Sequence, residues 1–574
     1  MVPKKRKRRK ARPKLSAEER RRRKIQSDHR RAARAIFRNL GFDRVTELAE
    51  TEIEFDGQAG EFDDAFLYEN LLVLMEYTTS QSSDVTDHLK KKKIIFSKTL
   101  ANPKGFLSYL RKRLPSFDER LGYHFHIDKI VLKIVYCSLN SFDNAVKNNV
   151  NEPVYLDFPI LKYFEKISRC VKMSALSEMF EFLDVEPTDV ARKGLFLSKS
   201  ESRTYEGLIL PEAASGFPPG FKVVSFYADA AALLDRAYVI RRDGWRSSFQ
   251  AYQRMLIGSK IDAIRKELKA EERVFVNNLI ATLPSDVHPE QPDGRTIEIK
   301  ELTNTAPVLI RLPRRANSIG LIDGQHRLFS YYEEKEDDPT IAKLRHQQNL
   351  LVTGIIYPEG MPRDEAERFA ANLFLAINAN QTNAPTPLRQ EIEVFLRPFS
   401  ATAIGRQVMQ RLAESGPLAG HVENYFFDKG KLKTSSIVSF GLGPLIKLSG
   451  EDSLFRLFTH PEKDQTAIGL SKDGLKAYLR FATTTINVFL GAVKASVDEA
   501  RWTPDPTVKN RLLTVTYVNS FLITLRRLIE DGQKIEFKSL CEALKGINDF
   551  DFKSYHSSQY ARMAGQIYEK HFKR

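Results

Sequence analysis

The chain has 574 residues, of which 42% are hydrophobic and 10% aromatic, enough to bury the cores of about three or four domains. No stretch reaches the roughly 18 consecutive apolar residues of a membrane helix, and no apolar segment follows the charged N-terminus, so we expect neither a membrane protein nor a secretory signal. The three cysteines lie far apart, which excludes a disulfide framework and favours a reducing, cytoplasmic compartment.

The positive charge is concentrated at the N-terminus. Residues 1–34 carry 17 Lys or Arg against three acids, which accounts for +14 of the net +16, so the rest of the chain is near neutral. Such a segment binds phosphate backbones without reading their sequence. We predict a basic disordered tail over residues 1–29 that contacts nucleic acid; the alternative is a solvated tail that only aids solubility. The residues assigned to nucleic-acid binding, which also resemble a nuclear localisation signal if the protein is eukaryotic, are Lys4, Lys5, Arg6, Lys7, Arg8, Arg9 and Lys10.

Residues 30–200 are predicted to form an α/β domain. A helix is expected from near Ser27, because apolar residues follow at helical spacing until Gly41. Residues 61–67 and 71–78 are predicted strands joined by a turn at Glu69 and Asn70. Residues 130–136 form a further apolar strand, and residues 106–114 a helix.

A second domain is predicted over residues 210–400, after a linker rich in Pro and Gly at 210–220. Strands are expected at residues 223–227, 237–240, 306–311, 318–322 and 350–357, and helices at 252–272 and 364–377. Beyond residue 400 strands largely disappear, and residues 401–574 are predicted to be helical. Apolar stripes at 475–499 and 507–529 indicate core packing, with a homo-oligomer or partner proteins as further possibilities.

One short run, Asp323-Gly324-Gln325-His326-Arg327, combines several features of an anion site. A strand ends before it, a glycine allows a tight turn, and a helix is expected to begin with its free N–H groups there. Arg is suited to bidentate phosphate contacts. The alternative is a tight turn in which Asp323 caps the helix and Arg327 is exposed.

This run resembles the DGQHR-domain family, which includes DndB-type proteins of DNA phosphorothioation systems and looks like a branch of the ParB/sulfiredoxin-like superfamily. Tyr252-Gln253-Arg254, Phe275–Asn278 and Phe374–Asn378 resemble the flanking segments, so that about a third of the chain is covered. The resemblance implies that a nucleoside triphosphate is bound through its phosphates. The residues it assigns to phosphate or nucleotide are Asp323, Gly324, Gln325, His326, Arg327, Asn378 and Gln381.

A second cluster of acids lies in the N-terminal domain, with Asp63 and Asp64 near one strand and Glu76 on the next. This stretch resembles a divergent PD-(D/E)xK nuclease, a family that gathers carboxylates around Mg²⁺ to activate water. The resemblance implies that Asp63, Asp64 and Glu76 are catalytic and hold the metal. The family's lysine is replaced by Thr78, and the cluster Lys90–Lys93 offers a migrated lysine, assigned to Lys90. The alternative is a hairpin with two exposed acids, or a degenerate nuclease fold kept for DNA binding.

These observations predict a DNA-binding protein of a DNA-modification or defence-type system. The first hypothesis is a nucleotide-regulated, magnesium-dependent DNA nuclease, an enzyme of the hydrolase class. The alternatives are a non-enzymatic DNA-binding regulator of DndB type, which Thr78 favours, and an NTPase that uses the Asp323–Arg327 loop.

Overall fold

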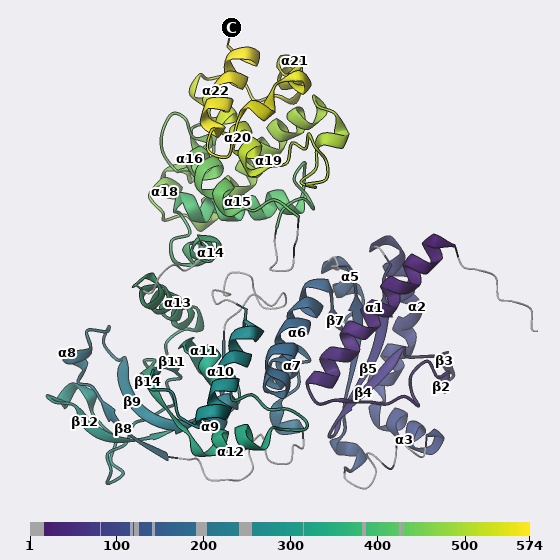
Figure 1. Ribbon diagram of the computed structural model, residues 1–574, viewed down its shortest axis with the longest axis vertical. Coiled ribbons are helices and arrows are strands. Elements are labelled where there is room, and N and C mark those ends of the chain that lie inside the picture. Colours follow the sequence, from purple (N-terminus) through teal and green to yellow (C-terminus); the bar gives the residue numbers. More distant parts are fainter. Residues whose placement is uncertain are drawn as a thin grey trace, which may run out of the picture. The chain divides into compact units, whose positions relative to one another are not determined.

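The computed structural model describes residues 16–80, 82–114, 117, 119, 125–140, 144–190, 204–239, 255–313, 315–380, 386–423, 428 and 430–573 (Figure 1). Helices and several mixed sheets confirm the α/β class. The described residues fall into two compact units, residues 16–360 and residues 361–573. The finer domain boundaries predicted from the sequence stay predictions.

The first unit begins with a five-stranded sheet in the order β1-β4-β5-β6-β7. Its central strand β5 is buried along its whole length because it is a run of apolar residues interrupted only near its end. β1 pairs antiparallel with β4 and β4 with β5, whereas β5–β6 and β6–β7 are parallel. The strands are β1 (Asp43–Arg44), β4 (Asp64–Tyr68), β5 (Leu71–Thr78), β6 (Val131–Ser138) and β7 (Val154–Leu156), and β2 (Ile53–Phe55) and β3 (Gln58–Gly60) form a separate hairpin.

Helices cover both faces of this sheet. The strand alternation divides the side chains: Val73 and Met75 of β5 join the core with α1 and α6, whereas Leu72 and Leu74 join the core with α2 and α3. The bounds are α1 (Ala17–Asn39), α2 (Ser82–Ala101), α3 (Pro103–Arg113), α5 (Asn144–Asn149), α6 (Phe158–Val171) and α7 (Leu176–Phe182).

Helix α1 begins well before its predicted start near Ser27, so the prediction of a disordered tail to residue 29 is wrong from Ser16 onward. Ser16 and Glu19 form a capping box that satisfies free N–H groups at the helix start. Residues 16–25 are exposed, and they include the basic run Arg20–Lys24. The missed signal was the capping box, which was outweighed by the basic composition of the segment.

The second sheet of this unit has seven strands in the order β10-β13-β11-β14-β9-β8-β12. β8 and β9 form an antiparallel pair around residues 210–220, which therefore connect two paired strands rather than two domains. The strands are β8 (Thr204–Ile209), β9 (Lys222–Asp229), β10 (Ala237–Tyr238), β11 (Leu279–Leu283), β12 (Ala306–Arg311), β13 (Ile319–Asp323) and β14 (Asn349–Ile356). The helices are α8 (Glu212–Ser215), α9 (Ala230–Leu234), α10 (Gly258–Glu271), α11 (Gln325–Phe329) and α12 (Pro339–Gln347).

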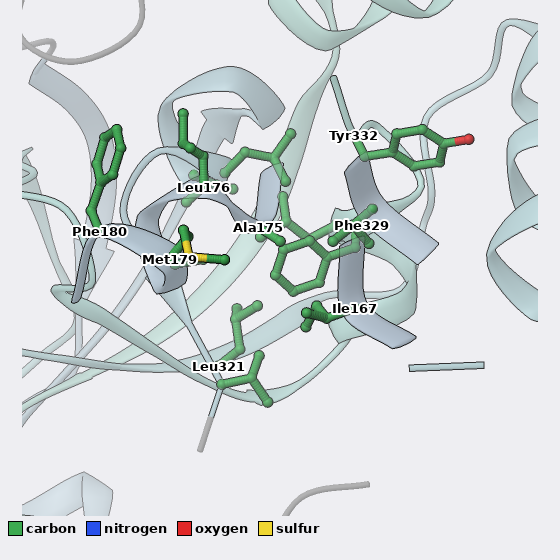
Figure 2. Close-up of a cluster of buried hydrophobic side chains, with 14 of the residues drawn as sticks. Ile167, Ala175, Leu176, Met179, Phe180, Leu321, Phe329 and Tyr332 are labelled. Carbon is green, nitrogen blue, oxygen red and sulfur yellow. The ribbon is translucent and has the colours of Figure 1, made fainter. Parts of the chain in front are cut away.

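One continuous core joins the two sheets of the first unit. Ile167 of α6 and Met179 of α7 belong to the same cluster of buried side chains as Leu321 of β13 and Phe329 of α11 (Figure 2). The N-terminal α/β segment and the segment that carries Asp323–Arg327 therefore support each other.

The second unit is helical, and its described residues contain no strand. The stripe predicted at 475–499 is confirmed as core, since Leu475, Leu479 and Ile486 are buried in α19. The helices are α13 (Arg363–Asn380), α14 (Thr386–Leu396), α15 (Ala401–Glu414), η5 (Ile437–Leu442), α16 (Gly443–Ile446), α17 (Leu454–Leu457), α18 (Lys463–Ala467), α19 (Lys472–Ala495), η6 (Glu499–Arg501), α20 (Val515–Glu530), α21 (Phe537–Ala543), η7 (Ile547–Asp549), η8 (Phe552–Ser554) and α22 (Tyr560–His571).

Among the helices that the structure describes, none has the length and apolar character needed to cross a bilayer.

Candidate functional site

Asp63 and Glu76 meet where strand β4 begins and strand β5 approaches its end. Asp64 pairs with Met75 in the antiparallel register, which places the preceding Asp63 opposite Glu76. The backbone N–H of Tyr77 donates to the Asp63 carboxylate at 2.9 Å. Two acids that the sequence placed on neighbouring strands are therefore adjacent in space.

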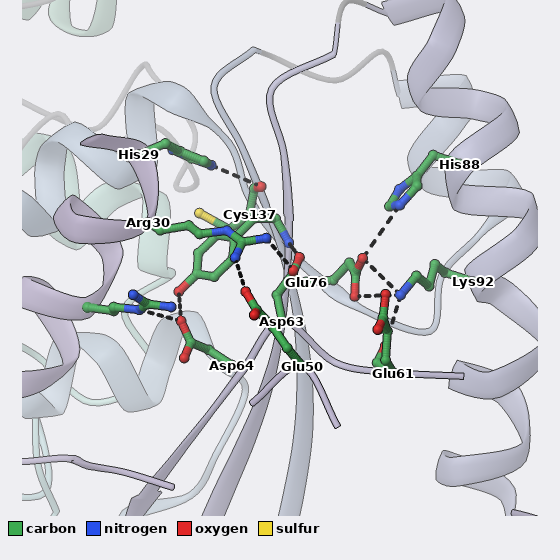
Figure 3. Close-up of polar contacts among 12 residues, drawn as sticks. His29, Arg30, Glu50, Glu61, Asp63, Asp64, Glu76, His88, Lys92 and Cys137 are labelled. Carbon is green, nitrogen blue, oxygen red and sulfur yellow. Dashed lines mark hydrogen bonds and ion pairs between the residues drawn. The ribbon is translucent and has the colours of Figure 1, made fainter. Parts of the chain in front are cut away.

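Glu76 is the most perturbed carboxyl group of this corner. Its side chain is 4% exposed and faces α2, where the Lys92 ammonium lies 3.0 Å away and His88 Nε2 lies 3.5 Å away (Figure 3). Burial and, less strongly, the charge of Asp63 raise the pKa of Glu76 to about 8, although Lys92 acts in the opposite direction. Glu76 therefore holds a proton near neutral pH unless additional positive charge stabilises the carboxylate.

The lysine that reaches this site is Lys92 rather than the predicted Lys90. Lys92 Nζ also donates to the Glu61 carbonyl at 2.9 Å, and its side chain is 17% exposed. Lys90 is 69% exposed and its ion pair is with Asp87 at 4.0 Å. One member of the predicted cluster Lys90–Lys93 therefore contacts Glu76, and which member does so depends on the face of α2 that packs against the sheet.

His88 lies one helical turn before Lys92 and belongs to the same face of α2. The tyrosine hydroxyl of Tyr136 lies 2.7 Å from its Nδ1. Burial, followed by the charge of Lys92, lowers the pKa of His88, so the ring is neutral at pH 7. No sequence motif marks His88, and its spacing from Lys92 was the available signal.

Asp63 is held from the other side of the sheet edge by α1. The guanidinium of Arg30 lies 2.5 Å from Asp63 and also forms an ion pair with Glu50. Figure 3 shows Asp63 between Arg30 and the Glu76 cluster. The Arg30 guanidinium and the Tyr77 N–H therefore fix the orientation of the Asp63 carboxylate.

Asp64 lies apart from the predicted metal group. It is fully buried, with Arg34 at 2.6 Å and Arg44 at 2.5 Å, and the Tyr77 hydroxyl donates to it at 3.0 Å. Strand alternation explains this placement, because Asp64 shares the face of Met75 that packs against α1. Its contacts are those of a residue that fastens α1 to the sheet.

No group of three or more His, Cys, Asp or Glu in the described ranges is arranged to hold a metal ion. Asp63 and Glu76 supply carboxylate oxygens, the donors that Mg²⁺ prefers. Mg²⁺ commonly takes only one or two protein carboxylates and completes its shell with water and substrate phosphate. This donor set fits such an ion.

The Asp323–Arg327 loop forms the predicted strand, glycine turn and helix start. β13 ends at Asp323, Gly324 has φ of +96°, and α11 begins at Gln325. A Cβ at Gly324 would lie 2.4 Å from Leu279 Cδ2, so both the backbone angle and the space require glycine.

The side chains of this loop make contacts within the protein. Arg327 donates to the Asn278 carbonyl at 2.8 Å and to the Asp323 carboxylate at 3.1 Å. His326 Nε2 accepts from the Ile257 N–H at 3.2 Å. Arg327 Nε is buried, with no hydrogen-bond partner among the described atoms.

For several further predicted residues the structure describes no side-chain contacts. Lys4–Lys10, Tyr252–Arg254 and Gln381 lie outside the described residues. Asn378 lies in α13, in the second unit.

Comparison with protein-family models, with curated proteins and with solved structures finds no match for this chain.

Proposed function

We propose that this protein is a magnesium-dependent nuclease that acts on DNA through Asp63, Glu76 and Lys92. The observation that carries the proposal is the buried Glu76, whose pKa is about 8, in contact with Lys92 and opposite Asp63. Strongly perturbed carboxyl groups with a defined charge partner are typical of functional sites.

The residues present suit phosphodiester hydrolysis. Asp63 and Glu76 would hold the cation, which supplies an activated water and stabilises charge on the phosphate when bound. A cation held by Glu76 would favour the ionised form of the carboxyl group and would compete with the Lys92 ammonium for its oxygens. Lys92 is then placed to donate to the attacking water or a phosphate oxygen, and neutral His88 to accept a proton.

Contact with DNA is supported by α1. Its exposed start carries Arg20–Lys24, and the same helix places Arg30 on Asp63. A basic helix that continues to the acidic corner provides phosphate contacts beside the proposed site.

Cleavage of supercoiled plasmid in the presence of Mg²⁺ tests the proposal. Glu76→Gln keeps the shape of the side chain but removes its charge, and we expect the rate to fall on the order of 10²-fold or more. The matched control Asp87→Asn makes the same change on the exposed side of α2, where the side chain is 81% exposed, and should cleave as the wild type does. Equal cleavage by Glu76→Gln would remove Glu76 from the mechanism.

The alternative is a non-enzymatic DNA-binding regulator. It is favoured by Thr78 in the position of the family's lysine and by the direct ion pair of Lys92 with Glu76, which neutralises the carboxylate without metal. Footprintable DNA binding by the wild type without Mg²⁺-dependent cleavage would establish it.

Nucleotide binding at Asp323–Arg327 is a second candidate function, supported by the buried Arg327 Nε, for which the described residues supply no hydrogen-bond partner. An anion oxygen near this atom would satisfy it. Calorimetric titration of the whole protein with nucleoside triphosphates tests this, with loss of binding expected for Arg327→Ala. Absence of binding to the wild type would contradict it.

A further inference from the structure

The helical unit contains a cavity of about 300 Å³ near the C-terminus, between the loop that precedes α20 and the segment that precedes α22. This volume is at the small end of the roughly 300–1,000 Å³ of ligand pockets. No chemical motif marks this part of the chain in the sequence.

Four cations line the cavity: Arg501, Lys509, Arg511 and Lys553. Two acids, Asp549 and Asp551, line it too, so positive charge is in excess. None of the four cations forms an ion pair within 4.0 Å among the residues that the structure describes.

Two of these cations, Arg501 and Arg511, donate hydrogen bonds to backbone carbonyls of the segments that line the cavity. Arg501 donates to the Asn548 carbonyl at 2.6 Å and to the Asn510 carbonyl at 3.1 Å, which ties the two segments together. Arg511 donates to the Pro504 carbonyl at 3.1 Å. Lys509 and Lys553 are both exposed, so their ammonium groups are available to bind an anion.

Aromatic rings make up the other part of the lining. Tyr517 and Phe550 are half-buried and Phe552 is buried. Their rings support one another, with centroids 5.4 Å apart for Tyr517 and Phe552 and 5.0 Å apart for Phe550 and Phe552. Half-exposed rings on a fixed base provide stacking surfaces.

We propose that this cavity binds one nucleotide unit, with Lys509 and Lys553 on its phosphate and Tyr517 stacked on its base, because the Phe550 ring is already stacked on Tyr555 with the centroids 5.9 Å apart. Cations beside aromatic faces are the combination that single-stranded nucleic acids require. The unit is either a free mononucleotide or part of a DNA strand. This site is independent of whether Glu76 and Lys92 cut DNA.

Photo-crosslinking of the full chain to a short single-stranded oligodeoxynucleotide that carries 5-iodouracil tests the proposal. Peptide mapping separates adducts in the cavity from adducts on the basic N-terminus, which serve as an internal reference. We expect adducts on Tyr517. Their yield should fall about ten-fold in Lys509→Ala/Lys553→Ala, because two cations no longer neutralise the phosphate.

The matched control is Lys534→Ala/Lys538→Ala, which removes the same charge from exposed positions outside the cavity lining and should keep the adducts. Phe550→Ala should reduce the yield on Tyr517, because the Phe550 ring packs on Phe552, which in turn supports Tyr517. Competition by excess mononucleotide identifies the free nucleotide as the ligand, and its failure to compete identifies the strand. Adducts only outside the cavity, or an equal decrease in the control, would overturn the proposal.

Discussion

At the scale of single residues, the position of Glu76 links stability to pH. Its pKa is 4.5 in an ordinary environment and about 8 in the folded protein. Between these values the folded state keeps a proton that the unfolded chain releases. The stability that Glu76 contributes is therefore present below about pH 4.5 and is lost as the pH rises through 8.

Glu76→Gln cannot ionise, so it should gain thermal stability relative to the wild type as the pH rises from about 5.5 to about 8.5. We expect the difference in Tm to grow by a few degrees, at roughly 2–4 °C per kcal/mol. Thermal unfolding monitored by circular dichroism without divalent metal measures it. Asp87→Asn should follow the wild type at each pH, and a pH-independent difference for Glu76→Gln would contradict the assigned pKa.

Residue identity within a cluster was the hardest part to predict. The acids Asp63 and Glu76 could be paired from the sequence, because the strands and their turn at Glu69 were identified correctly. The assignment of Lys92 rather than Lys90 required the rotation of α2 about its axis, which is set by packing against the sheet. Asp64 lies on the face of the sheet opposite to Glu76, because neighbouring residues of a strand point to opposite faces. This alternation could have been applied to the sequence, but the resemblance to the nuclease motif grouped Asp64 with Asp63.

At the scale of elements, the turn between β13 and α11 depends on Gly324. Alanine there would combine a left-handed backbone angle with a clash against Leu279. Alanine at position 294, where φ is +86° and nothing lies within 4 Å of an added Cβ, would have the backbone strain without a clash.

We therefore expect Gly324→Ala to be less stable than Gly294→Ala by about 1–3 kcal/mol, the usual range for overpacking. Urea unfolding of the two variants beside the wild type measures the difference. Equal destabilisation of the two variants would mean that Leu279 moves aside without strain and that the close approach at Gly324 is unimportant for the fold.

The exposed start of α1 gives a second prediction at this scale. Arg21→Gln/Arg22→Gln keeps the helix but removes two charges. The slope of log K against log salt should become shallower by up to about 0.9 for each phosphate that the helix no longer neutralises. Fluorescence anisotropy with duplex DNA between about 50 and about 200 mM salt measures it.

The control for this measurement is Lys266→Gln/Lys300→Gln, which removes two exposed charges elsewhere in the first unit. An unchanged slope in the arginine variant, or an equal change in the control, would show that α1 makes no dedicated phosphate contacts.

Element prediction succeeded where apolar residues dominate and failed where charge does. The buried strand β5 and the stripe in α19 follow directly from their apolar patterns. The start of α1 was missed because a run of arginines was interpreted as disorder, although Ser16 and Glu19 marked a helix cap. β8 was missed although its partner β9 follows it directly, because its other partner β12 is distant in the sequence.

At the scale of the whole molecule, the basic helix and the acidic corner belong together. The first unit carries the basic helix, the paired carboxylates and the Asp323–Arg327 loop on a shared core. Long-range contacts such as Arg327 with Asn278 follow from that core, and no local pattern in the sequence predicts them.

Our central claim is that the corner where β4 begins and β5 ends, completed by a lysine from α2, is a DNA-cleaving centre. Single-turnover nicking of supercoiled plasmid with Mg²⁺ by Lys92→Met beside Lys90→Met tests it most directly, because the two variants remove the same charge two positions apart. We expect a decrease on the order of 10²-fold or more for Lys92→Met and wild-type nicking for Lys90→Met. Wild-type nicking by Lys92→Met, or a decrease confined to Lys90→Met, would contradict the claim.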